Sequence, residues 1–171
     1  MNPRTLTIPG QTTLGGGSFE APGATLYLRT SPNAVNWFYC GSIALPQDLD
    51  RTRPCSVYLR AQPSASYTPS YEVDLTLSTE LWVDGLVTSV TNFPYLWSTP
   101  SPWTISTVQR VLIDPTGNGY TFPDHHFPVG RVVLACLLTR IGTSVDDTYP
   151  SFVRIPLGLE FTYSPVCQIP Q

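Results

Sequence analysis

The sequence predicts an all-β protein, a single antiparallel two-sheet sandwich of jelly-roll type with an extended N-terminal arm. Residues 153–163 alternate strictly between apolar and polar side chains, which is the period of a strand with one face in a core. Residues 71–83 show the same alternation. The chain also holds 18 Pro and 12 Gly in 171 residues, so it contains no stretch that reads as a helix. Eight or nine such strands fit a jelly roll, although a closed barrel and an immunoglobulin-like sandwich remain alternatives.

Residues 1–23 are predicted to form the arm, and residues 24–171 the folded domain. The first segment contains three prolines and a run of three glycines at positions 15 to 17, which excludes a helix and provides a flexible hinge. It is nevertheless more apolar than a frayed terminus. We expect its apolar side chains to contact a neighbouring subunit: Leu6, Ile8, Leu14 and Phe19.

The first half of the domain contains candidate strands at residues 25–29, 35–45, 55–61 and 71–83. The last of these is long for a strand, and its length allows a bend from one sheet to the other near Ser78. Beyond it, prolines interrupt every period between residues 84 and 102, which predicts a long loop rich in aromatic residues. Its rings either close one end of the sandwich or stack on a sugar or a protein partner, and Tyr95 and Trp97 are candidate contacts.

The second half begins with a candidate strand at residues 103–113, a turn at 114–119 and a short strand at 120–122. Residues 132–138 are apolar without interruption, as in a strand covered on both faces. A polar connection at 142–150 leads to the alternating stretch 153–163, and we expect two antiparallel core strands. Pro156 cannot donate to a sheet ladder, so it predicts a sheet edge or a bulge at that point.

The composition limits the possible partners. Charged residues are only 12% of the chain, about half the usual quarter, and all nine basic residues are Arg. The missing Lys indicates either a surface covered by partners or a compositional bias. The net charge of −3 and the absence of a basic run argue against nucleic-acid binding. No apolar stretch is long enough to span a membrane, and the four cysteines are too widely spaced for a zinc or redox motif, so we expect free thiols.

Two polar clusters contain residue types that are common in metal sites or in enzyme active sites. Asp124-His125-His126 offers metal-ligand types, but neighbours on an extended chain point in opposite directions and the chain has no other His. We therefore expect no metal, and treat His125 and His126 as candidate partner contacts. Asp146-Asp147, with Asp124 or Glu160, has the residue types of a glycosidase pair. Capping of backbone amides explains the Asp-Asp-Thr sequence more simply, so we expect no cofactor and no enzymatic activity.

One part of the chain resembles a known group of proteins. The resemblance consists of Pro128 and Gly130, an apolar strand ending in Arg140, the loop Asp146-Asp147-Thr148-Tyr149, and an alternating strand from Val153 that closes on Tyr163. This order is similar to the C-terminal part of jelly-roll domains in tailed-bacteriophage virion proteins. It covers about a fifth of the chain. Arg131 departs from the pattern, since an acidic residue usually follows the glycine, and so does the missing second arginine near Cys136; a cross-strand ion pair of that group is therefore in doubt.

The resemblance implies a structural protein of a bacteriophage particle, made in the host cytoplasm and located in the virion. A decoration or cement protein that binds the major capsid protein or other virion proteins is the first expectation, as a homo-oligomer, with a trimer favoured. The alternative is a receptor- or glycan-binding module of a tail fibre.

Overall fold

The computed structural model describes residues 2–8, 12–13, 18–20, 27–113, 132–156 and 159–166. Within these ranges every regular element is a β-strand, and no helix is present that could cross a membrane. The strands are β1 (Arg4–Ile8), β2 (Thr12–Thr13), β3 (Ser18–Glu20), β4 (Tyr27–Thr30), β5 (Val35–Ala44), β6 (Ser56–Pro63), β7 (Glu72–Val83), β8 (Leu86–Ser98), β9 (Gln109–Leu112), β10 (Val132–Ile141), β11 (Val153–Pro156) and β12 (Leu159–Tyr163).

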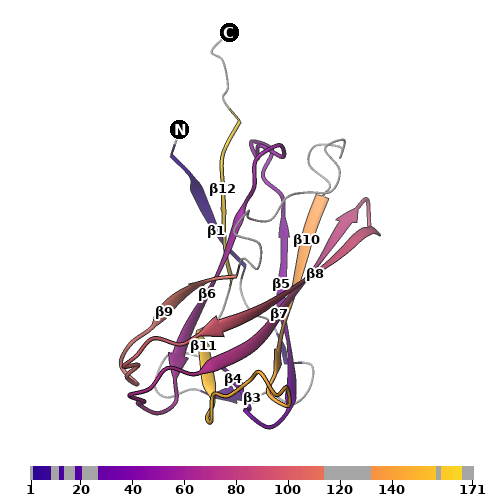
Figure 1. Ribbon diagram of the computed structural model, residues 1–171. Coiled ribbons are helices and arrows are strands. Elements are labelled where there is room, and N and C mark those ends of the chain that lie inside the picture. The colour runs from indigo at the N-terminus through magenta and orange to yellow at the C-terminus, as the bar shows by residue number, and fades with distance from the viewer. Residues whose placement is uncertain are drawn as a thin grey trace.

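The strands form two sheets in which all pairings are antiparallel (Figure 1). A five-stranded sheet has the order β2-β5-β10-β7-β8, and a seven-stranded sheet has the order β1-β12-β6-β11-β4-β3, with β9 also paired to β6. From β4 to β11, successive strands alternate between the two sheets, except at the β7–β8 hairpin. This winding around a shared core is that of a jelly-roll sandwich, as predicted.

The two alternating stretches form strands whose apolar faces are buried, as predicted. Along β7, Val73, Leu75, Leu77, Thr79 and Leu81 face the core, while the residues that alternate with them are half-buried. In β11 and β12, the buried side chains are those of Val153, Ile155, Leu159, Phe161 and Tyr163. Leu157, predicted on the same face, lies outside the described residues. Period-two alternation therefore identified the inward face correctly in both sheets.

The register along β6 changes near Pro156. Arg154 pairs with Gln62 and Leu159 pairs with Leu59, so five residues along β11 and β12 correspond to three along β6. This offset agrees with the irregularity predicted at the proline.

Two expectations about the long strands were wrong. β7 does not bend into the other sheet, because it stays paired with β8 from Glu72 to Val83 and with β10 from Leu75 to Val83. The two strands at the C-terminal end are not partners of one another. β10 lies in the five-stranded sheet and β11 and β12 lie in the other, so the connection at 142–152 crosses between the sheets.

The aromatic loop predicted at residues 84–102 is mostly the strand β8. A two-residue turn, Asp84-Gly85, joins it to β7, and both residues have positive φ, 50° and 84°. An Asp-Gly pair between apolar strands is a strong hairpin signal because both central positions of a type I′ turn need positive φ. The sequence contains this signal, but the prolines of the same segment led to the prediction of a loop. Pro94 is tolerated because β8 is an edge strand of its sheet.

The described part of residues 1–23 is not a separate arm. β1 pairs with β12 over five residues, β2 pairs with β5, and β3 pairs with β4. Leu6 stands opposite Phe161 and packs against the core. These segments therefore belong to the sandwich and are not a separate arm, and the expectation for Leu6 is corrected because it packs on its own domain. Contacts of Ile8, Leu14 and Phe19 with a neighbouring subunit stay a prediction.

A chain that starts at Ser18 lacks β1 and β2 and is expected to be destabilised. The deletion uncovers the edge of β12 and the core beside Leu6. We expect a loss of about 2 kcal/mol or more, seen as a fall of roughly 4–8 °C in the thermal midpoint. A chain that starts at Arg4 keeps both strands and serves as the control. An unchanged midpoint for the Ser18 chain would show that β1 is not part of the folded unit.

The core lies between the sheets and also contains cysteine side chains. Cys55 and Cys136 are both buried, and Cys55 is a free thiol. Burial raises the pKa of Cys55 to about 12, so this thiol stays protonated and unreactive at neutral pH. Cys40 and Cys167 are not described at the side-chain level.

Candidate functional site

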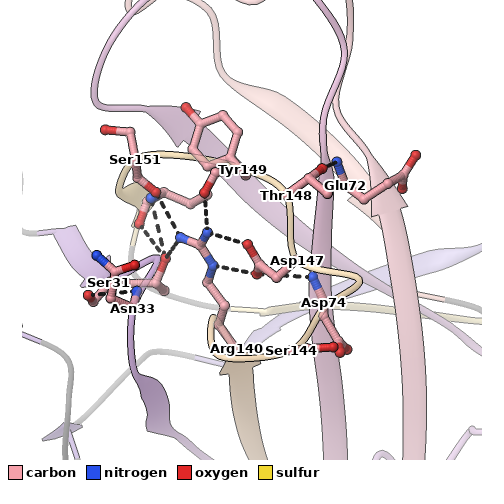
Figure 2. A network of polar contacts seen from close by, with 12 residues as sticks. Ser31, Asn33, Glu72, Asp74, Arg140, Ser144, Asp147, Thr148, Tyr149 and Ser151 are labelled. Atoms are coloured by element: carbon pink, nitrogen blue, oxygen red, sulfur yellow. Dashed lines mark hydrogen bonds and ion pairs between the residues drawn. The ribbon is translucent and has the colours of Figure 1, made fainter.

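The most highly connected polar group lies where the chain passes from β10 to β11 (Figure 2). Arg140, near the end of β10, points into the loop of residues 142–152 and is fully buried. Its side chain forms an ion pair with Asp147, whose side chain is also fully buried. A buried charge is tolerated only when it is paired and hydrogen-bonded, so this loop is organised around the arginine.

Every N–H of the Arg140 guanidinium has a partner. Nε donates to Oδ2 of Asp147 at 2.8 Å, and Nη2 donates to Oδ1 at 2.7 Å. Nη2 also donates to the carbonyl of Tyr149, and Nη1 donates to the carbonyl of Ser151, both at 2.9 Å. The fifth bond runs from Nη1 to the hydroxyl of Thr30 on β4, at 3.1 Å. The bidentate pair, the two carbonyls and the Thr30 hydroxyl together satisfy all five donors without water.

The same loop is bonded to the start of β7. The backbone N–H of Asp74 donates to Oδ2 of Asp147, and that of Glu72 donates to the hydroxyl of Thr148. Thr148 and Tyr149 both donate their backbone N–H to the carbonyl of Glu72. The interpretation of Asp147 and Thr148 as caps of free amides is thus confirmed.

This arrangement ties the two sheets together at one end of the sandwich, since Thr30 belongs to one sheet and β7 and β10 to the other. The loop begins at Gly142, where a Cβ would lie 2.5 Å from the carbonyl oxygen of Ser31. Only glycine allows this approach, and it brings the loop over β4. We call this network the latch, and it leaves no N–H of Arg140 for a substrate.

The carboxylates considered as a glycosidase pair do not form one. Both oxygens of Asp147 accept from Arg140, while Asp146 is exposed. Glu160 lies on β12 and is bound by Arg60 and Arg110. Asp124 lies outside the described residues. The described carboxylates are therefore held by arginines or separated, and they do not face a common cleft.

Aromatic rings fill the space beside the latch. Trp97 and Trp103 meet edge to face with ring centroids 5.0 Å apart, and Trp103 also lies 5.7 Å from Tyr149. Tyr67 and Tyr71 complete the cluster around Tyr149. Trp97 is only 6% exposed and Trp103 only 1%. The reading in which these rings close one end of the sandwich is correct, and Trp97 cannot offer its face to a partner.

The hydroxyl of Tyr149 is buried in this cluster and has no hydrogen-bond partner among the described residues. Burial raises the pKa of Tyr149 well above its usual value. A buried hydroxyl without a partner costs stability, because its hydrogen bonds to water are lost on folding.

Replacing Tyr149 by Phe should therefore leave stability unchanged or raise it by about 1 kcal/mol. The matched control is Tyr163→Phe, since the Tyr163 hydroxyl donates to Asp48 at 3.1 Å and its loss should cost about 0.5–1.5 kcal/mol. Urea denaturation of the two variants gives both values. A clear loss at Tyr149 would mean that its hydroxyl has a partner, such as a bound water.

The other predicted contact residues are scattered. Tyr95 is half-buried on β8 and packs against the core. Ile8 on β1 and Phe19 on β3 pair with β12 and β4, and their side chains are not described. Leu14, His125 and His126 lie outside the described residues. Among the residues that are described, no group of three or more His, Cys, Asp or Glu side chains is placed to hold a metal.

The structure brings together a surface that the sequence analysis missed. Along the edge strand β8, Val87 is 45% exposed, Val90 58% and Leu96 48%, and their partners on β7, Trp82, Glu80 and Asp74, all lie on its outer face. We call Val87, Val90 and Leu96 the β8 apolar row. The turn end of the β7–β8 hairpin extends away from the other strands, at the upper right of Figure 1. The signal was the Asp-Gly turn, which would have identified β8 as a strand with an outward face.

A second polar cluster lies on the opposite sheet. Glu160 accepts from Arg60 at 2.5 Å and from Arg110 at 2.6 Å. The hydrogen bond from Arg110, with a further contribution from Arg60, lowers the pKa of Glu160 below its usual range. The Arg110 guanidinium also lies 3.4 Å above the ring of Tyr58. Both arginines remain about half exposed, so each keeps donors that face solvent.

Comparisons with known proteins give little guidance. No protein-family model matches the chain, and no curated protein matches it either. Among solved structures it is similar to a family 11 carbohydrate-binding module from Clostridium thermocellum, in complex with a β-1,3-1,4-mixed-linked tetrasaccharide. The two share 9% sequence identity with a TM-score of 0.40, over 94% of this chain and 88% of that one. A likeness of this size supports no inference about a ligand.

Proposed function

We propose that this chain is a non-enzymatic structural protein of a bacteriophage particle. It acts as a decoration or cement protein that stabilises the shell through subunit contacts with its own copies, as a trimer, and with the major capsid protein or another virion protein. The phage assignment rests on the resemblance in residues 128–163, and the structural role rests on the surface.

The observation that supports this role most strongly is the β8 apolar row. Three large aliphatic side chains are exposed on one edge strand, and β8 itself contains no charged residue. Free edge strands of soluble proteins are usually protected by charged side chains, especially Lys, and this chain contains no Lys. A strand of this kind is typical of a surface that another protein covers.

The tail-fibre alternative receives less support from the described residues. It needs aromatic rings that a sugar can reach, and Trp97 and Trp103 lie in the core. The buried carboxylate of Asp147 is likewise unavailable to sugar hydroxyls. Non-catalytic packing is therefore the better account of the aromatic residues.

The test is incorporation into particles. Purified particles should contain the protein in hundreds of copies, and free protein should co-sediment with particles that lack it. The double variant Val90→Glu/Leu96→Glu should lose at least tenfold in this binding, because it buries charges without partners. Val145→Glu is the matched control, since Val145 is 93% exposed in the 142–152 loop.

Absence of the protein from purified particles would refute the virion role. Wild-type binding by the double variant would refute the role of the β8 apolar row. Specific binding to a glycan array, with no binding to particles, would favour the tail-fibre alternative.

A further inference from the structure

The charges of this chain segregate between the two sheets. Five of the nine arginines lie on strands of the seven-stranded sheet: Arg4, Arg29, Arg60, Arg110 and Arg154. The strands of the five-stranded sheet carry a single basic residue, Arg140, and it is fully buried. Arg51 and Arg53 lie in the loop before β6, and Arg131 is outside the described residues.

The strand register places four of these arginines side by side on one face. Arg110 on β9 stands opposite Arg60 on β6, and Arg154 on β11 stands opposite Arg29 on β4. Arg154 is also opposite Gln62, two residues along β6 from Arg60. Residues paired in this way share a face, with side chains about 5 Å apart when opposite and about 7–8 Å when diagonal.

This face is the outer one. The neighbours of Arg60 on β6, Leu59 and Ala61, are buried, and so are Val153 and Ile155 beside Arg154. The four arginines form a continuous basic stripe from β9 to β4. Glu160 is the carboxylate bound to two of them, and Glu20 pairs with Tyr27 at the far edge of the sheet. Four positive charges against two negative ones leave this face basic.

The outer face of the five-stranded sheet carries the opposite charge. Glu72, Asp74 and Glu80 alternate with the buried residues of β7, so all three point away from the core. Asp74 stands opposite Leu96 of the β8 apolar row, and Glu80 stands opposite Val90. We call the three carboxylates with this row the acidic face, and the four arginines the basic stripe.

Arginines opposite one another on neighbouring strands oppose sheet formation, because like charges at this distance repel. Glu160 offsets the repulsion at Arg60 and Arg110. Guanidinium groups bind carboxylates with two parallel hydrogen bonds, so a face with this excess of positive charge suits an anionic partner. The acidic face offers such carboxylates beside exposed aliphatic side chains that gain from burial.

We propose that the basic stripe binds the acidic face of a second copy of this chain. The contact joins two different surfaces. Each copy can therefore bind one neighbour through its basic stripe and a second neighbour through its acidic face. Such head-to-tail contacts close into a ring when the rotation between copies allows it, and otherwise extend as a filament. The inference names a partner for the surface on which the proposed function rests, but it is tested in solution without particles.

The experiment reverses each face separately in the full-length chain. Asp74→Arg/Glu80→Arg makes the acidic face basic. Arg60→Glu/Arg154→Glu makes the stripe acidic while leaving Glu160 bound to Arg110, and it places new carboxylates opposite Arg110 and Arg29. The control Arg51→Glu/Arg53→Glu makes the same charge change as Arg60→Glu/Arg154→Glu, at two residues of the loop before β6. Circular dichroism and thermal midpoints confirm that each variant is folded.

Sedimentation velocity then measures self-association. Wild type and the control should associate at low salt and dissociate as salt is raised, because salt screens exposed charges. Each face-reversed variant alone should associate at least tenfold more weakly. An equimolar mixture of the two should associate again, since one is basic on both faces and the other acidic on both.

Recovery in the mixture is the decisive result, because two misfolded proteins would not restore one another. The proposal is overturned if the mixture stays monomeric, or if either variant alone associates as wild type does. It is also overturned if wild type is monomeric and the stripe binds heparin or DNA instead, which would make it a site for polyanions. If self-association fails in these assays, the proposed function is not affected, because it is tested separately by incorporation into particles.

Discussion

Replacing Arg140 by Met is expected to cost about 3–5 kcal/mol of folding stability. The substitution leaves the Asp147 carboxylate buried, with the bond from the Asp74 amide but without its counter-ion. It also removes the hydrogen bonds that Arg140 donates to the carbonyls of Tyr149 and Ser151. The loop is then held to β7 only by the remaining hydrogen bonds of Asp147, Thr148 and Tyr149. Urea denaturation followed by tryptophan fluorescence measures the loss.

The control for this variant is Arg53→Met, which breaks an exposed ion pair with Asp50 and should cost less than about 1 kcal/mol. A double variant, Arg140→Met with Asp147→Leu, should recover part of the loss because no unpaired charge remains in the interior. Equal losses in the Arg140 and Arg53 variants would show that water reaches the latch in solution.

Replacing Trp103 by Ala is the second change with a large expected effect, again about 3–5 kcal/mol. The ring lies between Trp97 and Tyr149, and its indole N–H donates to the carbonyl of Thr107 at 3.1 Å. Its backbone exchanges two hydrogen bonds with Tyr67, both 2.9 Å. Removing the ring opens a cavity at the end of the sandwich that these backbone bonds prevent from collapsing.

Trp82→Ala is the matched control, because Trp82 is only half-buried on the outer side of β7. It should lose less than half as much stability as Trp103→Ala in the same assay. A small effect at Trp103 with a large effect at Trp82 would mean that the inward and outward faces have been exchanged at this end.

The sequence alone predicted both the position and the inward face of strands that bury one face and expose the other. In β7 and β11 to β12, alternation identified the strands and the inward side chains, because the side-chain period of a strand is set by local backbone geometry. The same reasoning failed at β8, where three prolines around residues 94–102 masked the Asp-Gly turn. It also failed in the arm, where short strands are held by pairing with β12, β5 and β4 and not by their own propensity.

The candidate site was predictable only in part. Asp146-Asp147-Thr148 was correctly read as a capping sequence, and Arg140 was noted as the end of a strand. That Arg140 and Asp147 form one buried pair depends on the loop folding back over β4 and β7. Trp97 was misplaced as a contact because an aromatic residue has the same sequence signature in a plugged core as on a binding surface.

What the sequence determined by itself is the β class, the faces of its long strands and the shortage of charge, all of which follow from residue type and local period. Only the tertiary structure decided which strands are neighbours, because antiparallel pairing joins residues that are far apart in the chain. Arg29, Arg60, Arg110 and Arg154 show the difference. No two of them are close in sequence, and no basic run indicates them, yet the register of four strands sets them side by side on one face.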